Sequence, residues 1–435
     1  MDNIQSLKGF RDLGPMEASQ REKVLGKIRA VFQRYGFLPL ETPALEYKEI
    51  LTGKYGAEGD KLLYSFKDQG GRDVAMRYDL TVPLARFVAS NQDLAMPFKR
   101  YQIAPVWRAD RPQKGRYREF VQCDVDVVGS DSIFADAEII ACMNTALKEL
   151  GIPEVLIKIN NRKVLNGMMR AAKIEVKKTT AAIRSLDKLE KIGEDEVRGE
   201  LASAGIQAKQ ADALFEMLGQ ALEDPKDVLS KLDGIDGAGE LAELLEILLD
   251  MGVKNYQVDL TLARGLEYYT GSIFEFVLPD AREFGSVAGG GRYDNLIGMF
   301  STPPSSPPKL GGEGRGIPAV GASIGIDRLT SALEELELVK FDSVSDVLVC
   351  NLEEDLDEKY LQIVQDLRGA GIKTDFYYEA AKLDKQLKYA NKKNIDFAVL
   401  IGPDEAKKDE ATVKNMKTGK QEKVKQKDLI RKLKP

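Results

Sequence analysis

The chain has 435 residues, which is enough for two or three domains with substantial cores. Charged residues make up 30% and hydrophobic residues 43%, the balance of a soluble globular protein, and no apolar run approaches the ~20 residues that a bilayer-spanning helix needs. Histidine is absent, which excludes Ser–His and Cys–His catalytic pairs and any zinc or haem site ligated by histidine. The chemistry must therefore use Arg, Lys, Asp, Glu, Tyr and bound metal.

Cysteine usage and charge bear on the compartment and the partners. The three cysteines lack C-x-x-C spacing, which favours free thiols in a reducing compartment over a disulfide or zinc framework. The N-terminal sequence MDNIQSLKGFRDLGP has no charged-then-apolar signal pattern, so we expect no secretion and a cytoplasmic protein. The net charge is −6, yet residues 345–435 hold 19 Lys+Arg against 17 Asp+Glu. A basic end on an acidic body suits a nucleic-acid partner, although a solvated Lys-rich surface is the default interpretation.

The first 90 residues predict a helix, an edge strand and a hairpin followed by a second helix. Apolar residues recur at helical spacing over 18–35, and the extended run 37–47 contains Pro39 and Pro43, which suit an edge or interface strand because proline cannot donate to a sheet ladder. Residues 62–88 predict a hairpin that turns at 69–71, then a strand and a helix from about Thr81. Asp79 and Thr81 lie at this junction, where either side chain could cap the helix.

Residues 98–129 predict two strands joined by a basic loop. The loop contains Pro112 and Gly115 and gathers arginines near Arg108, and planar guanidinium groups suit phosphate oxygens. An ordinary solvated turn is the alternative. In the second arm, apolar and polar residues alternate, which places three polar side chains on one face beside the basic loop: Gln122, Asp124 and Asp126. Such a face could hold a cationic or hydrogen-bond-donating small molecule next to a phosphate.

The middle of the chain changes character twice. Residues 132–150 predict a helix and 155–159 an apolar strand, whereas 171–250 are rich in Ala, Leu, Lys and Glu at helical spacing and predict an inserted helical subdomain. Strand formers resume at Tyr256 around Arg264, and a run of three glycines, 289–291, lets the backbone approach a ligand closely.

The last third of the chain predicts a loop, a strand–helix unit and a separate small domain. Residues 301–316 are rich in Pro, Ser and Gly and predict a surface loop. A strand and a helix with Arg328 near its start follow. From 344 onward, strands alternate with helices and end in a hairpin turning at 417–420 and a basic helix, which indicates a small α/β domain with parallel strands.

Several of these segments together resemble one family. VWRADRPQKGRYREF resembles motif 2 of class II aminoacyl-tRNA synthetases, and of histidyl-tRNA synthetases in particular. The first helix and proline-ended strand resemble motif 1, which forms the dimer interface, and the strand–helix unit with Arg328 resembles motif 3. VDLTLARGLEYYTGS and GSVAGGGRYDN resemble the two histidine-specific motifs. RYDLT resembles the archaeal and eukaryotic form of its segment more than the bacterial RPEGT. In this chain Asp79 therefore stands where the bacterial form has Glu.

The resemblance implies an α+β catalytic domain on an antiparallel sheet (1–170 and 251–335), a helical insertion (171–250) and a C-terminal α/β anticodon-binding domain (345–435). It implies ATP-dependent ligation of L-histidine to its tRNA through a histidyl-adenylate, with Mg²⁺ as cofactor, in a homodimer. A non-catalytic histidine-sensing regulatory subunit of ATP phosphoribosyltransferase is the alternative, but such relatives usually lack the C-terminal domain and the arginines of motifs 2 and 3.

The resemblance also implies roles for individual residues. Arg108 and Arg264 are the expected catalytic residues, and both bind ATP together with Arg328. The histidine site comprises Asp79, Thr81, Gln122, Asp126, Arg264, Tyr268, Tyr269 and Tyr293. The tRNA acceptor end meets Arg111, Gln113 and Arg116, and no residue is expected to ligate a metal. This chemistry suits a chain without histidine, because the attacking α-carboxylate has a pKa of about 3.5 and needs no general base.

Overall fold

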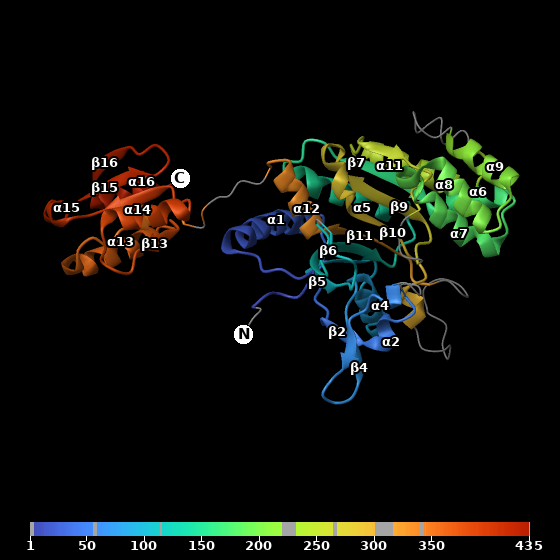
Figure 1. Cartoon of the computed structure of the whole chain (residues 1–435), viewed down its shortest axis with the longest axis horizontal. Coiled ribbons are helices and arrows are strands. Elements are labelled where there is room, and N and C mark those ends of the chain that lie inside the picture. Colours follow the sequence, from blue (N-terminus) through green and yellow to red (C-terminus); the bar gives the residue numbers. More distant parts are fainter. Residues whose placement is uncertain are drawn as a thin grey trace. The chain divides into compact units, whose positions relative to one another are not determined.

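The computed structural model describes residues 4–54, 59–113, 115–219, 232–263, 268–300, 316–338, 343 and 345–434. The chain forms two compact units, Met1–Asp12 with Val24–Leu338 and Leu13–Lys23 with Val339–Pro435. Most of the first unit is drawn in blue to orange and the second mainly in red in Figure 1. Arg264 and the loop 301–315 lie outside the described residues. No described helix is both long and apolar enough to cross a membrane.

The first unit is built on a large, mainly antiparallel sheet, which confirms the predicted fold class. Within the described residues it has eight strands, and only the pairs at its two edges, β1–β5 and β7–β8, are parallel. In spatial order the strands are β1 (Leu38–Pro39), β5 (Phe98–Trp107), β6 (Glu119–Val128), β11 (Ala319–Gly325), β10 (Ser286–Arg292), β9 (Ser272–Val277), β7 (Leu156–Asn161) and β8 (Tyr256–Val258). Pro39 occupies an edge strand, as predicted, because it has no N–H to donate.

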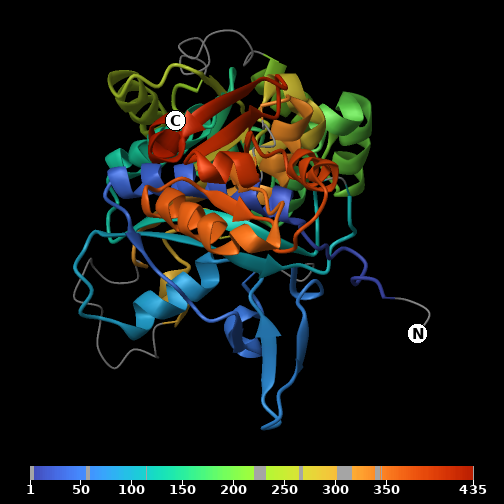
Figure 2. The ribbon, with the colours of Figure 1, turned by 90° about the vertical axis from the view of Figure 1, so that its left-hand side faces the viewer.

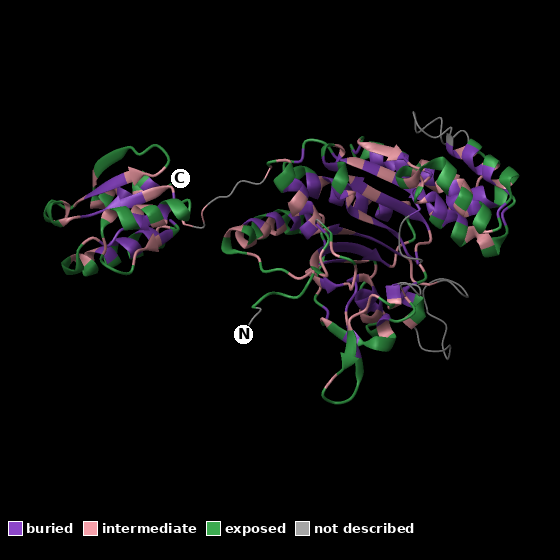
Figure 3. Ribbon diagram, in the orientation of Figure 1, coloured by how far each residue is buried: buried purple, intermediate pink, exposed green. Residues whose placement is uncertain are grey.

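Helix α5 (Ile133–Glu149) covers one face of this sheet. It begins where the Ser132 hydroxyl accepts a hydrogen bond from the Phe134 N–H, and it ends at Leu150. The helix packs against β6, β11, β10 and β9, and α11 (Ala238–Asp250) packs against α5. Its side chains are buried over most of its length, which Figure 3 shows in purple.

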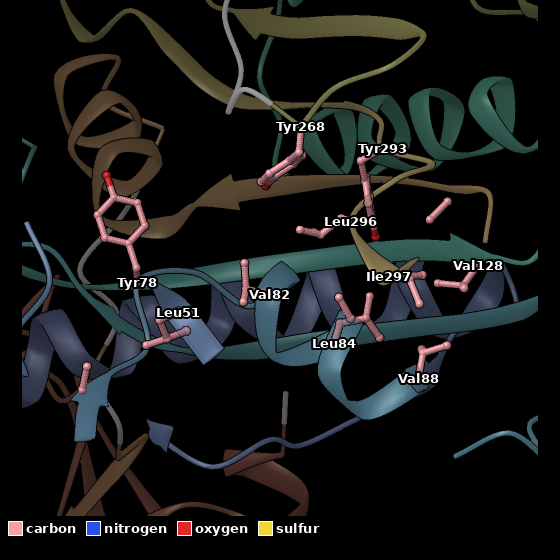
Figure 4. Packing of buried hydrophobic residues seen from close by; sticks show 13 residues of the cluster. Leu51, Tyr78, Val82, Leu84, Val88, Val128, Tyr268, Tyr293, Leu296 and Ile297 are labelled. Carbon is pink, nitrogen blue, oxygen red and sulfur yellow. The ribbon is translucent and has the colours of Figure 1, made fainter. Parts of the chain in front are cut away.

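A three-stranded sheet and a pair of helices flank the large sheet. β2 (Leu45–Tyr47), β4 (Asp73–Met76) and β3 (Ser65–Lys67) pair antiparallel and extend away from the large sheet (Figure 2). The chain then enters α4 (Thr81–Ser90), beside which lies α2 (Lys48–Leu51). Leu51, Val82 and Leu84 pack with Tyr268 and Tyr293 in one apolar cluster (Figure 4). This cluster packs α4 against the segments that carry the histidine-specific motifs.

The predicted insertion is helical in its described part. It contains α7 (Val176–Leu186), α8 (Leu189–Ser203) and α9 (Ala208–Gly219), and α6 (Arg162–Ala171) packs on α7 and α9. These helices bury apolar residues between them and expose their charged residues. The last part of the predicted range is α11, which packs on α5 of the large-sheet domain instead.

Residues 256–277, where strand formers were predicted to resume, contain two separate strands. Only the two ends are strands, β8 and β9, and the described residues between them form turns. Asp259 explains the interruption at the first end, because its Oδ1 accepts hydrogen bonds from the Thr261 N–H at 3.0 Å and from the Thr261 hydroxyl at 2.6 Å. Such a local turn competes with the sheet ladder for backbone donors.

The second unit is the predicted small α/β domain. In the part that the structure describes, its sheet has five strands, with three parallel ones followed by an antiparallel hairpin. The strands in spatial order are β13 (Thr374–Phe376), β12 (Val347–Val349), β14 (Phe397–Leu400), β15 (Glu410–Asn415) and β16 (Gln421–Lys425). Both faces of the sheet are buried, because α13 (Asp357–Gly369) and α16 (Leu429–Leu433) share one apolar cluster with it and α14 (Leu383–Lys392) shares the other.

Candidate active site

Strand β6 forms the floor of the site. Alternation along the strand turns Gln122, Asp124 and Asp126 to one face, as predicted, and all three side chains are buried. Across the ladder, β11 places Ser323 opposite Asp124 and Gly321 opposite Asp126. The Gln122 amide donates a 2.7 Å hydrogen bond to the Ser323 hydroxyl. The floor is therefore a polar surface held by two neighbouring strands.

A cavity of about 130 Å³ lies over this floor. It is lined by residues from several separate segments of the first unit: Asp79, Thr81, Arg108, Gln122, Asp124, Asp126, Tyr268, Tyr269, Gly289, Tyr293, Gly321, Ala322 and Ser323. Every residue expected in the histidine site lines this cavity except Arg264, which lies outside the described residues. Asp79 is also tied to the start of α4, since its Oδ1 accepts a 3.0 Å hydrogen bond from the Val82 N–H.

Two buried side chains hold Asp126 in the cavity. The Tyr293 hydroxyl donates to Oδ1, and Figure 4 shows Tyr293 pointing that hydroxyl toward the large sheet. Oδ2 pairs with the Arg100 guanidinium at 2.7 Å. Burial raises the pKa of Asp126, and the positive charge of Arg100 opposes that rise. Burial likewise raises the pKa of Tyr269 and of Tyr293, so both hydroxyl groups keep their protons at neutral pH.

Arg100 was not identified from the sequence. It is fully buried in β5, directly across the ladder from Asp126, and donates a 3.2 Å hydrogen bond to the Leu80 carbonyl. The alternation of β5 with the register of the β5–β6 hairpin would have revealed it, because a charged residue opposite Asp126 on the buried face needs a partner of opposite sign.

The glycine run serves the packing of the sheet as well as the cavity. Gly289 lines the cavity. A Cβ on Gly290 would lie 2.1 Å from the Gly321 carbonyl oxygen, and one on Gly291 would lie 2.5 Å from the Ser272 carbonyl oxygen and 3.0 Å from the Tyr269 ring. The closest approaches at Gly290 and Gly291 are thus to neighbouring strands and to Tyr269.

A second cavity of about 290 Å³ continues from the first, with which it shares Arg108, Gln122, Gly289 and Ser323. The Arg108 guanidinium lies 4.3 Å from the centre of the Tyr78 ring and 5.1 Å from that of Phe120. Its Nε donates a 3.0 Å hydrogen bond to the Tyr78 carbonyl. These contacts hold a planar cation at the junction of the two cavities.

Arg328 lines the second cavity but not the first. It lies in the first turn of α12 (Ile326–Glu335) and donates a 2.7 Å hydrogen bond to the Ser286 carbonyl. A helix N-terminus and an arginine together favour a bound anion in this cavity.

The three residues expected at the tRNA acceptor end lie on the loop between β5 and β6. Arg111 and Gln113 are exposed and line neither cavity, whereas Arg116 lines the second one and pairs with Asp110 at 2.6 Å. A bridge between Gln113 and Arg116 closes the loop.

An N-terminal arm, residues 7–12, packs against this loop. The sequence did not predict this contact. Arg11 donates to Asp327 Oδ1 at 2.7 Å, and its guanidinium lies 4.0 Å from the centre of the Tyr117 ring. Asp327 Oδ2 accepts from the Val121 N–H at 2.9 Å, so the arm, β6 and α12 meet at one carboxylate. The contact joins residues 316 positions apart, and no local sequence pattern indicates it.

Comparison with known proteins covers the whole chain. Residues 9–329 match the family Histidyl-tRNA synthetase, and residues 346–435 match the Anticodon binding domain. A histidine–tRNA ligase from Cytophaga hutchinsonii is 41% identical over 98% of this chain and 98% of its own length, and one from Rhodopirellula baltica is 42% identical over 95% and 93%.

A solved structure of histidyl-tRNA synthetase from Nostoc sp. superposes with a TM-score of 0.87 at 33% identity, covering 100% of this chain and 99% of that one. An ATP phosphoribosyltransferase regulatory subunit/histidyl-tRNA synthetase from Bacillus halodurans shares the fold at 23% identity, with a TM-score of 0.73 over 89% of this chain and 96% of that one. The match to the family extends over more than half of the sequence, and this chain belongs to the histidyl-tRNA synthetase family.

Proposed function

We propose that the chain ligates L-histidine to its tRNA in two steps, forming histidyl-adenylate from histidine and ATP and then transferring histidine to the tRNA 3′ end. AMP and pyrophosphate are the other products. The observation that carries this proposal is the pair of joined cavities, one with a polar floor sized for a small molecule and one lined by three arginines, of which Arg108 and Arg328 suit phosphates. Arg108 stands where the two meet, which suits a reaction between a carboxylate and a phosphate.

Recognition of the imidazole falls to Asp126 and Tyr269. A neutral imidazole offers one N–H donor and one acceptor nitrogen. The Asp126 carboxylate accepts from the N–H, and a protonated Tyr269 hydroxyl donates to the other nitrogen. Tyr293 and Arg100 fix the Asp126 carboxylate for this contact. An apolar side chain in the cavity would leave these buried groups unpaired, which disfavours isosteres of histidine.

The amino group and the carboxylate of histidine lie toward the second cavity in this proposal. Asp79, Thr81 and Gln122 accept hydrogen bonds from the α-ammonium group. Tyr268 packs against Tyr269 and Tyr293, with ring centres 5.2 and 5.9 Å away, and so closes the side of the cavity. The substrate's carboxylate then faces Arg108.

The adenylation step needs positioning and charge stabilisation, because the attacking carboxylate is already ionised at neutral pH. Arg108 contacts the α-phosphate and Arg328 the terminal phosphates. Arg264 is assigned to the reacting carboxylate and α-phosphate on the strength of its motif. Hydrogen bonds to charged groups contribute roughly 1.5–3 kcal/mol each, so two or three arginines can lower the barrier substantially.

The second cavity also fits Mg²⁺ bound through ATP. Among the described residues no three carboxylates, cysteines or histidines gather as a metal site, but Mg²⁺ usually keeps several waters and takes one or two carboxylates plus substrate phosphates. Asp110 lines the cavity, and the described contacts from Arg116 go to its Oδ2, so we assign Oδ1 to the ion's water shell. The ion would neutralise charge on the phosphates.

The remaining partners follow from the two units. Arg111, Gln113 and Arg116 on the exposed loop meet the tRNA acceptor end, and the second unit meets the anticodon. A homodimer is supported by large apolar side chains left exposed on the edge strand β1 and on β2, namely Leu38, Leu45 and Tyr47. Since its tRNA substrate is used in the cytoplasm, we place the activity there.

Histidine-dependent ATP–pyrophosphate exchange tests this function. The full chain should catalyse exchange of labelled pyrophosphate into ATP when histidine is supplied and not when any other amino acid is supplied. Arg108→Ala should lower this exchange rate at least ~100-fold while histidine binding persists. Glu190→Ala, a change in the exposed surface of the insertion, is the matched control and should keep the wild-type rate. A folded protein that binds histidine but shows no exchange would contradict the proposal and favour a histidine-sensing regulatory subunit.

A further inference from the structure

Asp124 is a buried carboxyl group at the floor of the first cavity that none of the roles above uses. It lies between Gln122 and Asp126 on β6, is 2% exposed and lines the cavity. Its ladder partners are Ser323 on β11 and Gln102 on β5. Among the described residues its Oδ1 has no hydrogen-bond partner. A buried carboxylate oxygen without a partner is costly, which points to a partner supplied by a ligand.

Within the described part of the chain, Asp124 forms no ion pair, although the charge of Arg100 acts on it. The polar and charged groups that face it from β5, β6, β11, the junction before α4, the end of β4 and the segment before β9 are Arg100, Asp126, Ser323, Asp79, Arg77 and Tyr269. Arg100 is committed to Asp126 at 2.7 Å, and Arg77 donates its hydrogen bonds to the carbonyls of Pro105 and Thr42. Three carboxyl groups thus lie near two buried arginines, whose described contacts go to Asp126 and to backbone carbonyls.

A bound proton would neutralise the Asp124 carboxylate when no ligand is bound. Burial is the largest cause that raises the pKa of Asp124, to about 7, and the negative charges of Asp126 and Asp79 add to the rise. Arg100 and the Ser323 hydroxyl oppose it. An incoming cation would reverse the balance, because a positive charge beside a carboxyl group favours its ionised form.

We propose that Asp124 is a further substrate-contacting residue, which holds a proton in the empty cavity and releases it to solvent when the α-ammonium group of histidine enters and donates a hydrogen bond to Oδ1. The inference rests on the function proposed above. We assign Asp124 to the ammonium group rather than to the imidazole because its neighbours are the residues assigned to the ammonium group. The Ser323 hydroxyl contacts both Asp124 and Gln122, and the negative charge of Asp79 acts on Asp124. The ammonium group keeps its own proton, so one proton leaves Asp124 for each histidine bound.

The pH dependence of binding follows from this exchange. Well above pH 7 Asp124 is largely ionised, and histidine binds with little linked release of a proton. Below pH 7 the proton must first leave, so the affinity contributed by Asp124 falls about tenfold for each pH unit. Asp124→Asn resembles the protonated group at every pH. The affinities of the wild-type chain and of the variant should therefore converge at pH 6 and separate at pH 8.

Calorimetry of histidine binding to the full chain in two buffers of different ionisation enthalpy measures the released protons. At pH 7 the wild-type chain should release ~0.5 proton more than Asp124→Asn, because a group with a pKa near 7 is half protonated there. The imidazole of the ligand titrates equally in both experiments and cancels in the difference. Asp93→Asn, at an exposed carboxylate outside the site, should release protons as the wild-type chain does.

Ser323→Ala provides a second, independent variant. It removes the hydroxyl that lowers the pKa of Asp124, so the pH midpoint of histidine affinity should move upward. Equal proton release and equal pH dependence in the wild-type chain and Asp124→Asn, or an unmoved midpoint in Ser323→Ala, would overturn this inference alone. A wild-type chain that binds no histidine at any pH would overturn the proposed function as well.

Discussion

Replacing Gly321 with alanine should displace Asp126 without removing its carboxylate. The added Cβ would lie 1.9 Å from Asp126 Oδ1 and 2.5 Å from its Cγ, whereas real Cβ contacts essentially never fall below 3.0 Å. The carboxylate must therefore move by about 1 Å, since the backbone of the paired strand at Val125 is also only 3.0 Å from the new atom. That movement breaks the geometry of the contacts from Tyr293 and Arg100.

The loss can be estimated from the contacts involved. One hydrogen bond to a charged group is worth roughly 1.5–3 kcal/mol, so losing the Asp126–imidazole contact should raise the KM for histidine ~10–150-fold. The free energy of unfolding should fall by ~2–4 kcal/mol, because two buried polar contacts are strained in the folded protein. The KM for ATP should stay within about a factor of three of the wild-type value, because Gly321 does not line the second cavity.

Steady-state ATP–pyrophosphate exchange with varied histidine and varied ATP separates these effects. Gly199→Ala is the matched control: it lies in α8, a Cβ there meets nothing within 4 Å, and it should leave exchange unchanged while adding up to ~1 kcal/mol of helix stability. A folded Gly321→Ala variant with the wild-type KM for histidine would refute the placement of the imidazole against Asp126.

Three further changes probe other parts of the site. Asp124→Asn should raise the free energy of unfolding at pH 8 by ~2–4 kcal/mol and leave it unchanged at pH 4. Because the pKa of Asp124 is raised in the folded protein, the stability that the protonated carboxyl group contributes below about pH 4 is lost as the pH rises toward 7. Asparagine does not titrate, so the variant does not lose this stability. Urea unfolding at both pH values measures it, and equal gains at pH 4 and 8 would contradict it. Arg108→Lys should lower kcat for exchange ~100-fold with little change in the KM for histidine, because lysine keeps the charge but loses the planar donors and the ring contacts; near-normal kcat would argue against phosphate contact by Arg108. Arg11→Ala should raise the KM for ATP by no more than ~3–10-fold, since Arg11 is 31% exposed and acts through its contacts with Asp327 and Tyr117; a raised KM for histidine with an unchanged KM for ATP would contradict this placement of the arm beside the second cavity.

Local patterns predicted the elements of the site well. The alternation of β6 placed Gln122, Asp124 and Asp126 on one buried face, and the breakers Pro112 and Gly115 marked the loop that joins β5 to β6. These features depend only on the two-residue period of a strand and on residues that end it, both of which are readable along the chain.

Features that depend on register or on distant contacts were not predictable in this way. Arg100 can be identified as the partner of Asp126 only when the register of β5 against β6 is known. Gly321 must lack a side chain because the register of β11 against β6 places it opposite Asp126. The junction at Asp79 and Thr81 was ambiguous because both residue types cap helices. The structure gives the capping hydrogen bond to Asp79, which leaves Thr81 to line the cavity.

The central claim is that this chain both activates histidine and transfers it to tRNA. The most direct measurement follows acid-precipitable labelled histidine and AMP together, in one reaction of the full chain with ATP, Mg²⁺ and tRNA. The proposed function predicts one AMP formed for each histidine attached, with both products lost when tRNA of another specificity is supplied under multiple turnover. AMP formation without attachment to the cognate tRNA, or neither product from a folded chain, would contradict it.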